Sequence, residues 1–440
     1  MDRIARLSRR EVLKACGKVL AAAPFTGMIA CGGHPAPVAQ NPGGSPYLGT
    51  DEQLLDELQR ATFQFFWNET NPNTGQIKDR AFLNGNDTRT MSSIAATGFG
   101  LTALCIGDSR GYGKTADITN RVRNTLQFLL QQMPNVHGFF YHFVDMNTGQ
   151  RWAQCELSSI DTSLLLCGVL TARQYFQNAE IQDLATKIYM RVEWPWMLNG
   201  GPTFSMGWTP ESGFLSARWE HYCELMMIYL LGIGSTTNPV PADTWNAWTR
   251  PTITYQGLTY ISGNDPLFTH QYSHAWFDFR NKKDAYANYF DNSVTATKAH
   301  KLFCLSLTSQ FSDYADNLWG ISASDYVKGY TAWGGPPAQG PIDGSIVPSA
   351  TGGSLPFLFA DCIKVLRTIR GAYAAKAWGG YSYVDAFNPL SGWYDTDVLG
   401  IDLGITMVMA ENYRTGLVWN TFMKNPETQA AMQKVGFHLA

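Results

Sequence analysis

Four carboxylates stand at the start, or within the first turns, of helical stretches built from apolar residues. Glu156 and Asp161 open the run CELSSIDTSLLL, Glu224 opens CELMMIYLL, and Asp402 opens IDLGITMVMAENY. Any one of them could be a helix cap or a first-turn acid favoured by the helix dipole. A buried acid costs stability unless it is paired, so several together indicate either an ion-pair network or a catalytic set with shifted pKa values. The arginines that could serve such a network are Arg173, Arg218 and Arg414.

A tryptophan-rich loop adds a fifth carboxylate. The segment 202–219, PTFSMGWTPESGFLSARW, places Glu211 between Trp208 and Trp219. Aromatic faces stack on the apolar faces of sugar rings, and carboxylates bind the hydroxyl groups, so this composition favours a carbohydrate ligand; plain packing of buried tryptophan is the alternative. Similar loops carry Trp152, Trp276, Trp333 and Trp393. The residues that we assign to substrate binding are Trp208, Trp219, His142, Tyr272, His274, Trp276, Trp393 and Arg414.

Other chemistries have weaker signals. His270, His274 and Asp278 lie four residues apart and would form a metal face on one helix, but the aromatic residues and Pro266 around them fit a cleft wall equally well. Gly113-Lys114-Thr115 resembles the end of a phosphate-binding loop, yet Asp108 stands where that loop needs glycine. The sequence has no GxSxG motif. We therefore expect neither a metal nor a cofactor.

Two kinds of helix alternate along the chain and would position these side chains. Stretches near 51, 115 and 179 are amphipathic, and the first opens with the capping-box pattern Thr50-Asp51-Glu52-Gln53. The stretches that follow them, 92–106, 160–176 and 222–234, are apolar around most of their circumference, as is 402–419. Repeated pairs of an outer and an inner helix are typical of helical hairpin arrays.

Six such hairpins would close a ring. Further helices are expected at 284–308, 354–374 and 402–422, so the predicted fold is an all-α (α/α)6 toroid forming one catalytic domain over residues 50–440. The long connections 135–158, 196–218, 250–272 and 311–352 would line the mouth of its cleft, because loops of that length in a compact domain are usually functional. The alternative is two helical domains joined around 236–250.

Composition limits the partners. The 440 residues are 45% hydrophobic and 16% charged, which excludes a mostly disordered protein. With 33 Lys and Arg against 36 Asp and Glu, the net charge of −3 gives no global positive field, so nucleic acid is not an expected partner.

The first thirty residues resemble an export signal. Six basic residues precede the uncharged stretch 19–30, which is too short to span a bilayer, and Ser8-Arg9-Arg10 opens a twin-arginine-like motif; an ordinary secretory signal is the alternative. The segment Met28-Ile29-Ala30-Cys31-Gly32 resembles a lipobox, although Met replaces the usual Leu, so Cys31 is a candidate lipid anchor. Residues 31–49 read as a flexible linker.

Removal of residues 1–30 leaves an acidic chain with a net charge of −7. Six cysteines remain in the domain without any CxxC pair, and most lie in apolar runs. We expect buried thiols rather than disulfides or a zinc site. These cysteines are Cys105, Cys155, Cys167, Cys223, Cys304 and Cys362.

Several long segments resemble the bacterial glycoamylase-like proteins, which include glycoside hydrolase family 144, the endo-β-1,2-glucanases. The resemblance runs from about residue 52 to the end of the chain. The segments that carry it are SSIAATGFGLTAL, HGFFYHFVDMNTGQR, CELSSIDTSLLL, NGGPTFSMGWTPESGFL, HQYSHAWFDFR, DGSIVPSA, VDAFNPLSGWYDTDVLGIDLG and ENYRTGLVW. The family usually has Tyr-Asn-Glu where this chain has Tyr222-Cys223-Glu224, a change that affects local hydrogen bonding rather than the glutamate.

The resemblance implies an (α/α)6 toroid and metal-free hydrolysis of a glucan with inversion. Inverting glycosidases use one carboxylic acid to protonate the leaving oxygen and a second carboxylate to activate water. Under this resemblance Glu224 or Glu211 is the candidate acid and Asp402 the candidate base. Asp161 and Glu156 are reserves for either role or for holding the sugar.

Together, the signal-like segment and the family resemblance predict an exported hydrolase of β-1,2-linked glucan, in the periplasm or attached to a membrane through Cys31. Two alternatives stay open: a non-catalytic glycan-binding lipoprotein, and a glycosidase of the same fold acting on another linkage. The sequence does not distinguish endo from exo action.

Overall fold

The computed structural model describes residues 44–264 and 266–440. The predicted export signal at 1–30, the candidate anchor Cys31 and most of the linker at 31–49 lie outside the described residues. The long helices are α2 (Asp51–Asn68), α3 (Ile94–Ser109), α4 (Thr115–Gln131), α5 (Ser159–Tyr175), α6 (Ala179–Met190), α8 (Met226–Gly234), α9 (Tyr289–Ser306), α11 (Phe359–Ala372), α13 (Gly400–Arg414) and α15 (Pro426–Lys434). Shorter ones are α7 (Trp194–Leu198), η1 (Ala242–Asn246), η2 (Leu267–His270), η3 (Tyr272–Ala275), α10 (Pro348–Gly352), α12 (Ala374–Ala377) and α14 (Leu417–Phe422).

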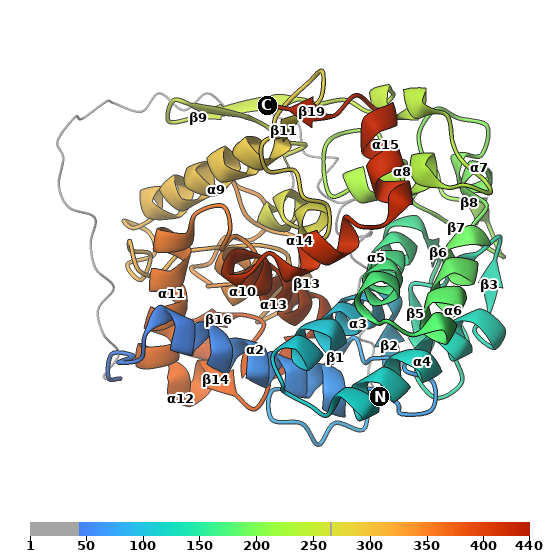
Figure 1. Cartoon of the computed structure of the whole chain (residues 1–440). Helices are drawn as coiled ribbons and strands as arrows, with labels where there is room; N and C mark the ends of the chain where they lie inside the picture. The colour runs from blue at the N-terminus through green and yellow to red at the C-terminus, as the bar shows by residue number, and fades with distance from the viewer. Residues whose placement is uncertain (1–43, 265) are drawn as a thin grey trace.

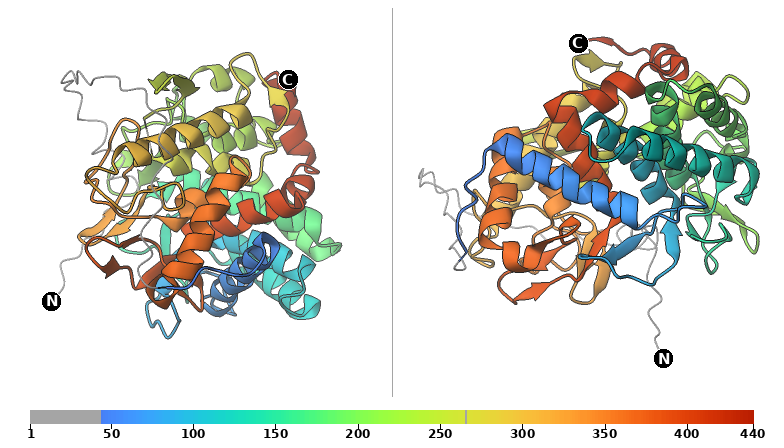
Figure 2. Two further views of the ribbon diagram at one scale, coloured as in Figure 1. Left: turned by 90° about the vertical axis from the view of Figure 1, so that its left-hand side faces the viewer. Right: turned by 60° about the horizontal axis from the view of Figure 1, so that its bottom comes forward.

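The helices form two concentric rings, as Figure 1 shows. In the described part of the chain the inner ring consists of α3, α5, α8, the η2–η3 pair, α10 and α13, and α13 contacts α3 to close it. The outer ring consists of α2, α4, α6, α15, α9 and α11. The right-hand view of Figure 2 shows α2 lying across the outside of the molecule. The predicted (α/α)6 toroid is confirmed, and the two-domain alternative is wrong because both halves share one ring.

The predicted alternation of amphipathic and apolar helices holds in the first half. Helix α2 begins at the capping box in which Thr50 and Gln53 bond each other's backbone N–H groups. Its apolar residues and those of α4 lie on one face, whereas α3 and α5 are buried on almost every side. A helix that is apolar all round is stable in water only when other helices enclose it, and this places α3, α5 and α8 inside.

The second half departs from a regular repeat. Helices α9, α11 and α13 match the predicted segments, but the inner positions between α8 and α13 are held by the short η2, η3 and α10. The outer position over α8 is filled by α15, from the C-terminal end of the described chain. The physical reason is that long loops take up much of the second half of the chain. Two inner positions are therefore occupied by helices of only one or two turns.

Short strands lie within the connections between the helices, and a last one follows α15. The first group is β1 (Arg80–Phe82), β2 (Met91–Ser93), β3 (Asn135–Val136), β4 (Phe139–Phe140), β5 (Phe143–Asp145), β6 (Leu157–Ser158), β7 (Gly207–Thr209), β8 (Gly213–Phe214), β9 (Thr252–Tyr255) and β10 (Leu258–Ile261). The second is β11 (Lys282–Lys283), β12 (Ser324–Tyr326), β13 (Gly329–Thr331), β14 (Trp378–Gly379), β15 (Ser382–Tyr383), β16 (Phe387–Asn388), β17 (Trp393–Tyr394), β18 (Asp397–Leu399) and β19 (His438–Leu439). All pairings between these strands are antiparallel, and β6, β7 and β8 form a three-stranded sheet.

Three inner helices begin directly at the end of a strand. Strand β2 leads into α3, β6 into α5 and β18 into α13, with no residue between them. Strand β2 pairs with β5, β6 with β7, and β18 with β1. These pairings fix the N-terminal ends of the inner helices against the long connections, and we call this end of the ring the rim.

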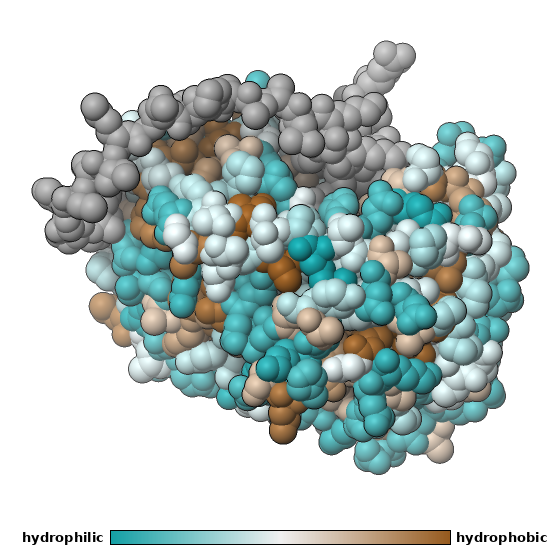
Figure 3. All heavy atoms as spheres, turned by 90° about the horizontal axis from the view of Figure 1, so that it is seen from above, coloured by the Kyte–Doolittle hydropathy of each residue, from teal (hydrophilic) through white to brown (hydrophobic). Residues whose placement is uncertain are grey.

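Three further observations concern the surface, membrane-spanning helices and the cysteine thiols. Figure 3 shows that the face carrying the C-terminus is mostly hydrophilic, with small separated hydrophobic patches. No helix within the described residues is long and apolar enough to cross a membrane. Cys105, Cys167, Cys304 and Cys362 are buried free thiols, as predicted, and Cys155 is half-buried.

The inner helices α3 and α5 approach each other backbone to backbone. A Cβ atom on Gly168 would lie 2.0 Å from the carbonyl oxygen of Gly98, and one on Gly98 would lie 2.3 Å from that of Leu164. Only glycine fits at such a contact, because backbone atoms on both sides cannot move independently of their helices.

We therefore expect Gly168→Ala to lower the free energy of unfolding by about 1–3 kcal/mol or more, the usual cost of overpacking a core. Urea unfolding followed by circular dichroism measures this. Gly380→Ala is the matched control, since the nearest atom to its Cβ is 3.5 Å away, and it should change stability by less than about 0.5 kcal/mol. Equal effects of the two substitutions would contradict the backbone contact.

Candidate active site at the rim of the ring

The first turns of α5 and α13 place two predicted carboxylates at the rim. Asp161 is buried in the first turn of α5, where Ser158 caps the helix: its hydroxyl accepts from the Asp161 N–H at 3.2 Å and donates to Asp161 Oδ2 at 2.5 Å. Asp402 is buried in the first turn of α13. Both positions follow from the strand-to-helix joints, because the joint fixes which residue begins the helix.

A histidine bridges Asp161 to Glu156. His142 Nδ1 donates to Glu156 Oε1 at 3.4 Å, and its Nε2 lies 3.6 Å from Asp161 Oδ2. All three side chains are buried, and the imidazole stacks on Phe143. Burial alone lowers the pKa of His142, but the charge of Asp161 and the hydrogen bond to Glu156 raise that pKa to about 9. At neutral pH the site therefore holds an imidazolium between two carboxylates.

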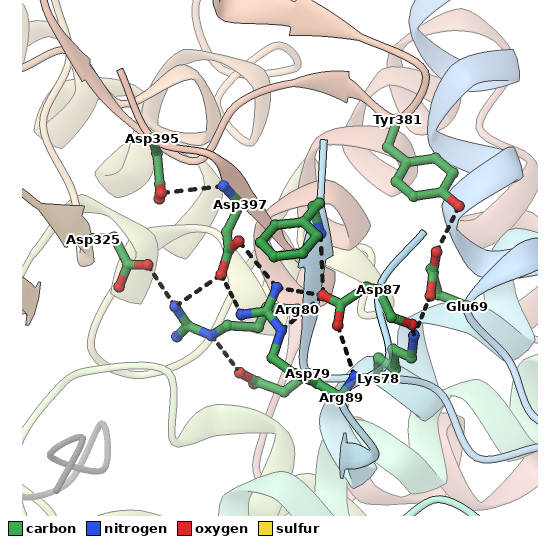
Figure 4. Close-up of polar contacts among 11 residues, drawn as sticks. Glu69, Lys78, Asp79, Arg80, Asp87, Arg89, Asp325, Tyr381, Asp395 and Asp397 are labelled. Atoms are coloured by element: carbon green, nitrogen blue, oxygen red, sulfur yellow. Dashed lines mark hydrogen bonds and ion pairs between the residues drawn. The ribbon is translucent and has the colours of Figure 1, made fainter. Parts of the chain in front are cut away.

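A buried arginine extends this charge network across the rim. Figure 4 shows Arg80 between Asp79, Asp325 and Asp397. Its Nε donates to Asp79 at 3.0 Å, and its Nη1 donates to Asp325 at 2.5 Å and lies 3.9 Å from Asp397. Burial lowers the pKa of Arg80, but the charges of Asp79 and Asp325 raise it further above its usual range. Asp79 also contributes to the raised pKa of His142, so the two clusters interact.

A second arginine closes the network on the outer side. Arg89 Nη1 donates to Asp397 at 2.6 Å, and its Nε donates to Asp87 at 2.7 Å. Beside it Lys78 forms an ion pair with Glu69 at 2.6 Å (Figure 4). Strand pairing of β1 with β18, from Arg80–Leu399 to Phe82–Asp397, brings these distant segments together.

Two further aspartates of the rim have strongly perturbed acidity. Burial, followed by the charges of Asp402 and Asp325, raises the pKa of Asp385 well above its usual range. Burial and the charge of Asp325 raise the pKa of Asp395 to about 7, although Arg80 opposes this. Asp385 and Asp402 line the same small cavity of about 10 Å³, together with Ser349 and Thr406. Carboxyl groups with shifted acidity are what acid and base catalysis requires.

Glu224 and Glu211 have different surroundings. Glu224 is buried at the start of the segment that leads into α8, where its carbonyl oxygen accepts from Ser273 Oγ at 2.7 Å. Glu211 lies in the turn between β7 and β8 with a side chain that is 49% exposed, and it pairs with Arg151 at 2.6 Å. That hydrogen bond lowers the pKa of Glu211. Contrary to expectation, its position does not provide the raised pKa that a general acid needs.

The predicted tryptophans of the rim lie in its strands and joints. Trp208 lies in β7 and packs against Trp196, with ring centroids 5.8 Å apart. Trp219 is buried and donates from Nε1 to Ser159 Oγ at 2.8 Å. Trp393 lies half-buried in β17. Trp208 and Trp393 thus keep partly accessible faces, while Trp219 supports the start of α5.

The predicted residues of 270–278 are packed in the interior. Trp276, which follows η3, is fully buried against Phe99 and donates to Thr102 Oγ1 at 3.0 Å, and Tyr272, the first residue of η3, also packs against Phe99. His274 lies 3.1 Å from Ser293 Oγ. Burial, with the nearby His270, lowers the pKa of His274 to about 3, so the ring is neutral. The assignment of His274 and Trp276 to substrate binding is not supported, because core packing occupies both side chains.

The alternative metal face is also wrong. Residues 267–275 form two short 3₁₀ helices rather than one α-helix, so His270, His274 and Asp278 do not share a face. His270 Nδ1 lies 3.2 Å from the Tyr222 hydroxyl, and Asp278 accepts from Arg280 at 2.9 Å.

Arg414 lies at the opposite end of the molecule from the rim. It ends α13, twelve residues after Asp402, which corresponds to about 18 Å of helix. Its guanidinium pairs with Glu52 and donates to Gln59 on α2. The structure therefore does not bring Arg414 to the other predicted site residues; it joins an inner to an outer helix. Likewise, Arg173 pairs with Glu427 at 2.6 Å rather than with a rim carboxylate.

Sequence reasoning missed most of the charge network. The residues concerned are Asp79, Arg80, Arg89, Asp325, Asp385, Asp395 and Asp397. A signal existed in the spacing of VDAFNPLSGWYDTDVLGID, which contains Asp385, Asp395, Asp397 and Asp402. A strand that leads directly into an apolar helix is itself buried. Carboxylates every few residues in such a segment therefore indicate paired or functional acids rather than a solvent-exposed loop.

Comparisons with known proteins agree with this architecture. The family model named Glycoamylase, described as "Putative glucoamylase", matches residues 216–426. A curated relative, the exo β-1,2-glucooligosaccharide sophorohydrolase (non-reducing end) of Parabacteroides distasonis, is 29% identical over 436 residues, covering 90% of this chain and 60% of the relative. The chain thus spans about 60% of the length of that relative.

Solved structures give the same result. A Bacteroides uniformis structure with the same description as the family model superposes with a TM-score of 0.84 at 27% identity, covering 89% of this chain and 98% of that one. The endo-β-1,2-glucanase of Chitinophaga pinensis, in complex with sophorotriose and glucose, gives a TM-score of 0.81 at 28% identity, covering 89% and 99%. The fold is the (α/α)6 toroid of these solved structures, with buried carboxylates at its rim. Within this class, the resemblance to the glycoamylase-like proteins is confirmed.

The bridge made by His142 predicts a pH dependence of stability. Because its pKa is raised from 6.5 to about 9, its contribution is fully present below about pH 6.5 and is lost as the pH rises through about 9. The loss should be on the order of 3 kcal/mol. Urea unfolding at a series of pH values between these limits should show stability falling in the wild type and a flatter profile for His142→Asn. His438→Asn, at an exposed histidine, should keep the wild-type slope; a wild-type slope in His142→Asn would contradict the assignment.

Proposed function

We propose that this protein is a glycoside hydrolase that cleaves β-1,2-linked glucan with inversion of configuration. The observation that carries the proposal is the set of buried carboxylates at the start of the inner helices, joined by one charge network. The named activities of the relatives in Parabacteroides distasonis and Chitinophaga pinensis support the β-1,2 linkage. Accessible aromatic side chains on β7 and β17 supply surfaces on which sugar rings can stack.

The acid in this mechanism is Glu224 and the base is Asp402. A general acid must hold its proton at the working pH, and an apolar surrounding favours the protonated form. Glu224 is buried beside Tyr222 and Leu225, whereas Glu211 is exposed and paired with Arg151. Asp402 stands at the start of α13, where the positive end of the helix dipole favours a carboxylate that activates water. Asp161 and Glu156, held by His142, serve to bind and orient the sugar.

Glu224→Gln and Asp402→Asn should each lower the rate of hydrolysis about 10²–10⁴-fold, the usual cost of losing a general acid or base. Glu211→Gln should stay within a few-fold of wild type and is the matched control. The measurement is chromatography of products from β-1,2-, β-1,3-, β-1,4- and α-1,4-glucans, with NMR of the first anomer released to show inversion. Binding of each variant to β-1,2-glucan should persist, because the amide keeps the side-chain shape.

Four outcomes would change this assignment. Loss of activity in Glu211→Gln but not in Glu224→Gln would move the acid to the β7–β8 turn. Full activity in Asp402→Asn would move the base to Asp161 or Glu156. Binding of glucan by the wild type without new reducing ends would identify a glycan-binding protein, and cleavage of another linkage would identify a different glycosidase.

We also propose that the protein is exported and held at a membrane by lipid on Cys31. The support is the sequence of residues 1–31, with its Arg9-Arg10 pair and lipobox-like segment. Export would bring the enzyme to glucans outside the cytoplasm.

Cell fractionation with mass spectrometry of the N-terminus tests this proposal. The protein should be found in the membrane fraction with Cys31 as its first residue, and Cys31→Ser should release it. Cys16→Ser is the matched control and should leave the distribution unchanged. Arg9→Lys with Arg10→Lys should block export. Recovery of wild-type protein from the cytoplasm with an intact Met1 would contradict export, while soluble periplasmic protein would contradict only the lipid anchor.

A further inference from the structure

Three aspartates of the rim bring one oxygen each to a common point. Asp325 lies in β12, Asp385 follows β15, and Asp395 lies between β17 and β18. One carboxylate oxygen from each lies within 4.8 Å of the other two. The mechanism proposed above assigns neither the acid nor the base role to any of these three aspartates.

Each of the three carboxylates has one oxygen fixed by the protein. Asp325 Oδ2 accepts from Arg80 at 2.5 Å, Asp385 Oδ2 accepts from the Asp325 N–H at 2.7 Å, and Asp395 Oδ1 accepts from the Asp397 N–H at 3.1 Å. Such hydrogen bonds orient the ligands of metal sites, because a carboxylate held at one oxygen presents the other in a defined direction.

The second oxygens of two of these groups are buried without a partner among the described residues. Asp385 Oδ1 and Asp395 Oδ2 have no hydrogen bond there, and Asp385 is only 3% exposed. An unpaired buried carboxylate oxygen costs several kcal/mol unless a proton or a cation compensates it. Both of these oxygens belong to carboxylates of one cluster, which Asp325 completes, and such a cluster calls for a shared positive charge.

Among the described residues, the two nearby arginines supply only part of that charge. Arg80 is divided among Asp79, Asp325 and Asp397, and Arg89 is held by Asp87 and Asp397.

We propose that Asp325, Asp385 and Asp395 form a binding site for a hard divalent cation of the calcium type. Calcium binds carboxylate oxygens at about 2.3–2.6 Å, so two ligands of one ion lie up to about 5 Å apart, which matches the spacing of this cluster. Magnesium demands a smaller octahedral shell near 2.1 Å and fits less well. The three ligands come from three separate segments, so the ion ties β12 to the loops that carry β15–β18.

The site lies next to the proposed base. Asp385 lines the same cavity as Asp402 and interacts with it electrostatically. A cation here would hold the rim in place and reduce the negative charge facing Asp402. The ion is structural in this proposal, which does not depend on the proposed hydrolysis.

The test uses chelator-treated wild-type protein without glucan. Calcium at roughly 5 mM, above the 10⁻⁴–10⁻³ M dissociation constants of weak calcium sites, should raise the thermal midpoint by several degrees, and magnesium should raise it less. Asp385→Asn and Asp395→Asn should weaken calcium binding at least about tenfold. Asp183→Asn, at an exposed carboxylate on α6, is the control and should bind as the wild type does.

A second measurement keeps the test decisive if Asp385→Asn fails to fold. Terbium, a luminescent substitute for calcium, should bind the wild type and be displaced by calcium, and Asp395→Asn should weaken it. The proposal is overturned if calcium, magnesium and manganese leave the wild-type midpoint unchanged and terbium does not bind. It is also overturned if Asp385→Asn and Asp395→Asn respond to calcium as the wild type does, since the cation would then bind elsewhere. A failure here with intact glucan cleavage would leave the proposed function unaffected.

Discussion

The rim depends on one buried guanidinium. Arg80 contacts Asp79, Asp325 and Asp397, and the first and last of these residues are more than 300 positions apart in the sequence. Removal of a buried charge partner typically costs 3–5 kcal/mol, because the other charge stays behind unpaired. Since β1 and β18 pair at this point and β18 leads directly into α13, the position of Arg80 also sets where the last inner helix begins. The placement of Asp402 follows from the same contact.

Negative charge is in excess around this centre, and that excess connects stability with function. Arg80 and Arg89 neutralise part of it, and the imidazolium of His142 neutralises another part beside Asp161 and Glu156. The negative charge that these cations do not neutralise is concentrated at Asp385, Asp395 and Asp402, and burial together with this charge raises the pKa values of Asp385 and Asp395. A site that must protonate a glycosidic oxygen and activate water needs carboxyl groups of unequal acidity. The packing of the inner helices, which includes the backbone contact at Gly98 and Gly168, stabilises the fold and offsets the free-energy cost of burying these charges.

The structure places Asp161 and Asp402 in the first turns of inner helices, as the sequence predicts, and places Glu211, His274 and Arg414 in surroundings that the sequence did not indicate. Asp161 and Asp402 could be placed because an acid at the start of an apolar helix has a defined position in a ring of helices. Glu211 and His274 lie in loops, where the sequence indicates an aromatic surrounding but not whether the side chain faces solvent, the core or the cleft. The sequence suggested that Arg414 contacts substrate because it belongs to a helix that begins at the rim. At about 1.5 Å per residue, however, the length of α13 puts Arg414 far from Asp402 at the start of that helix.

The sequence by itself determined the toroid, the order of its first three helical hairpins and the buried acids at the starts of α5 and α13. These depend on hydrophobic periodicity, which is local along the chain. Only the tertiary structure decided that α15 fills an outer position, that Arg80 sits among three aspartates, and that Asp325, Asp385 and Asp395 converge. The reason is physical: charge pairing at the rim arises between strands far apart in sequence, and the register of β1 against β18 leaves no periodic trace in either segment.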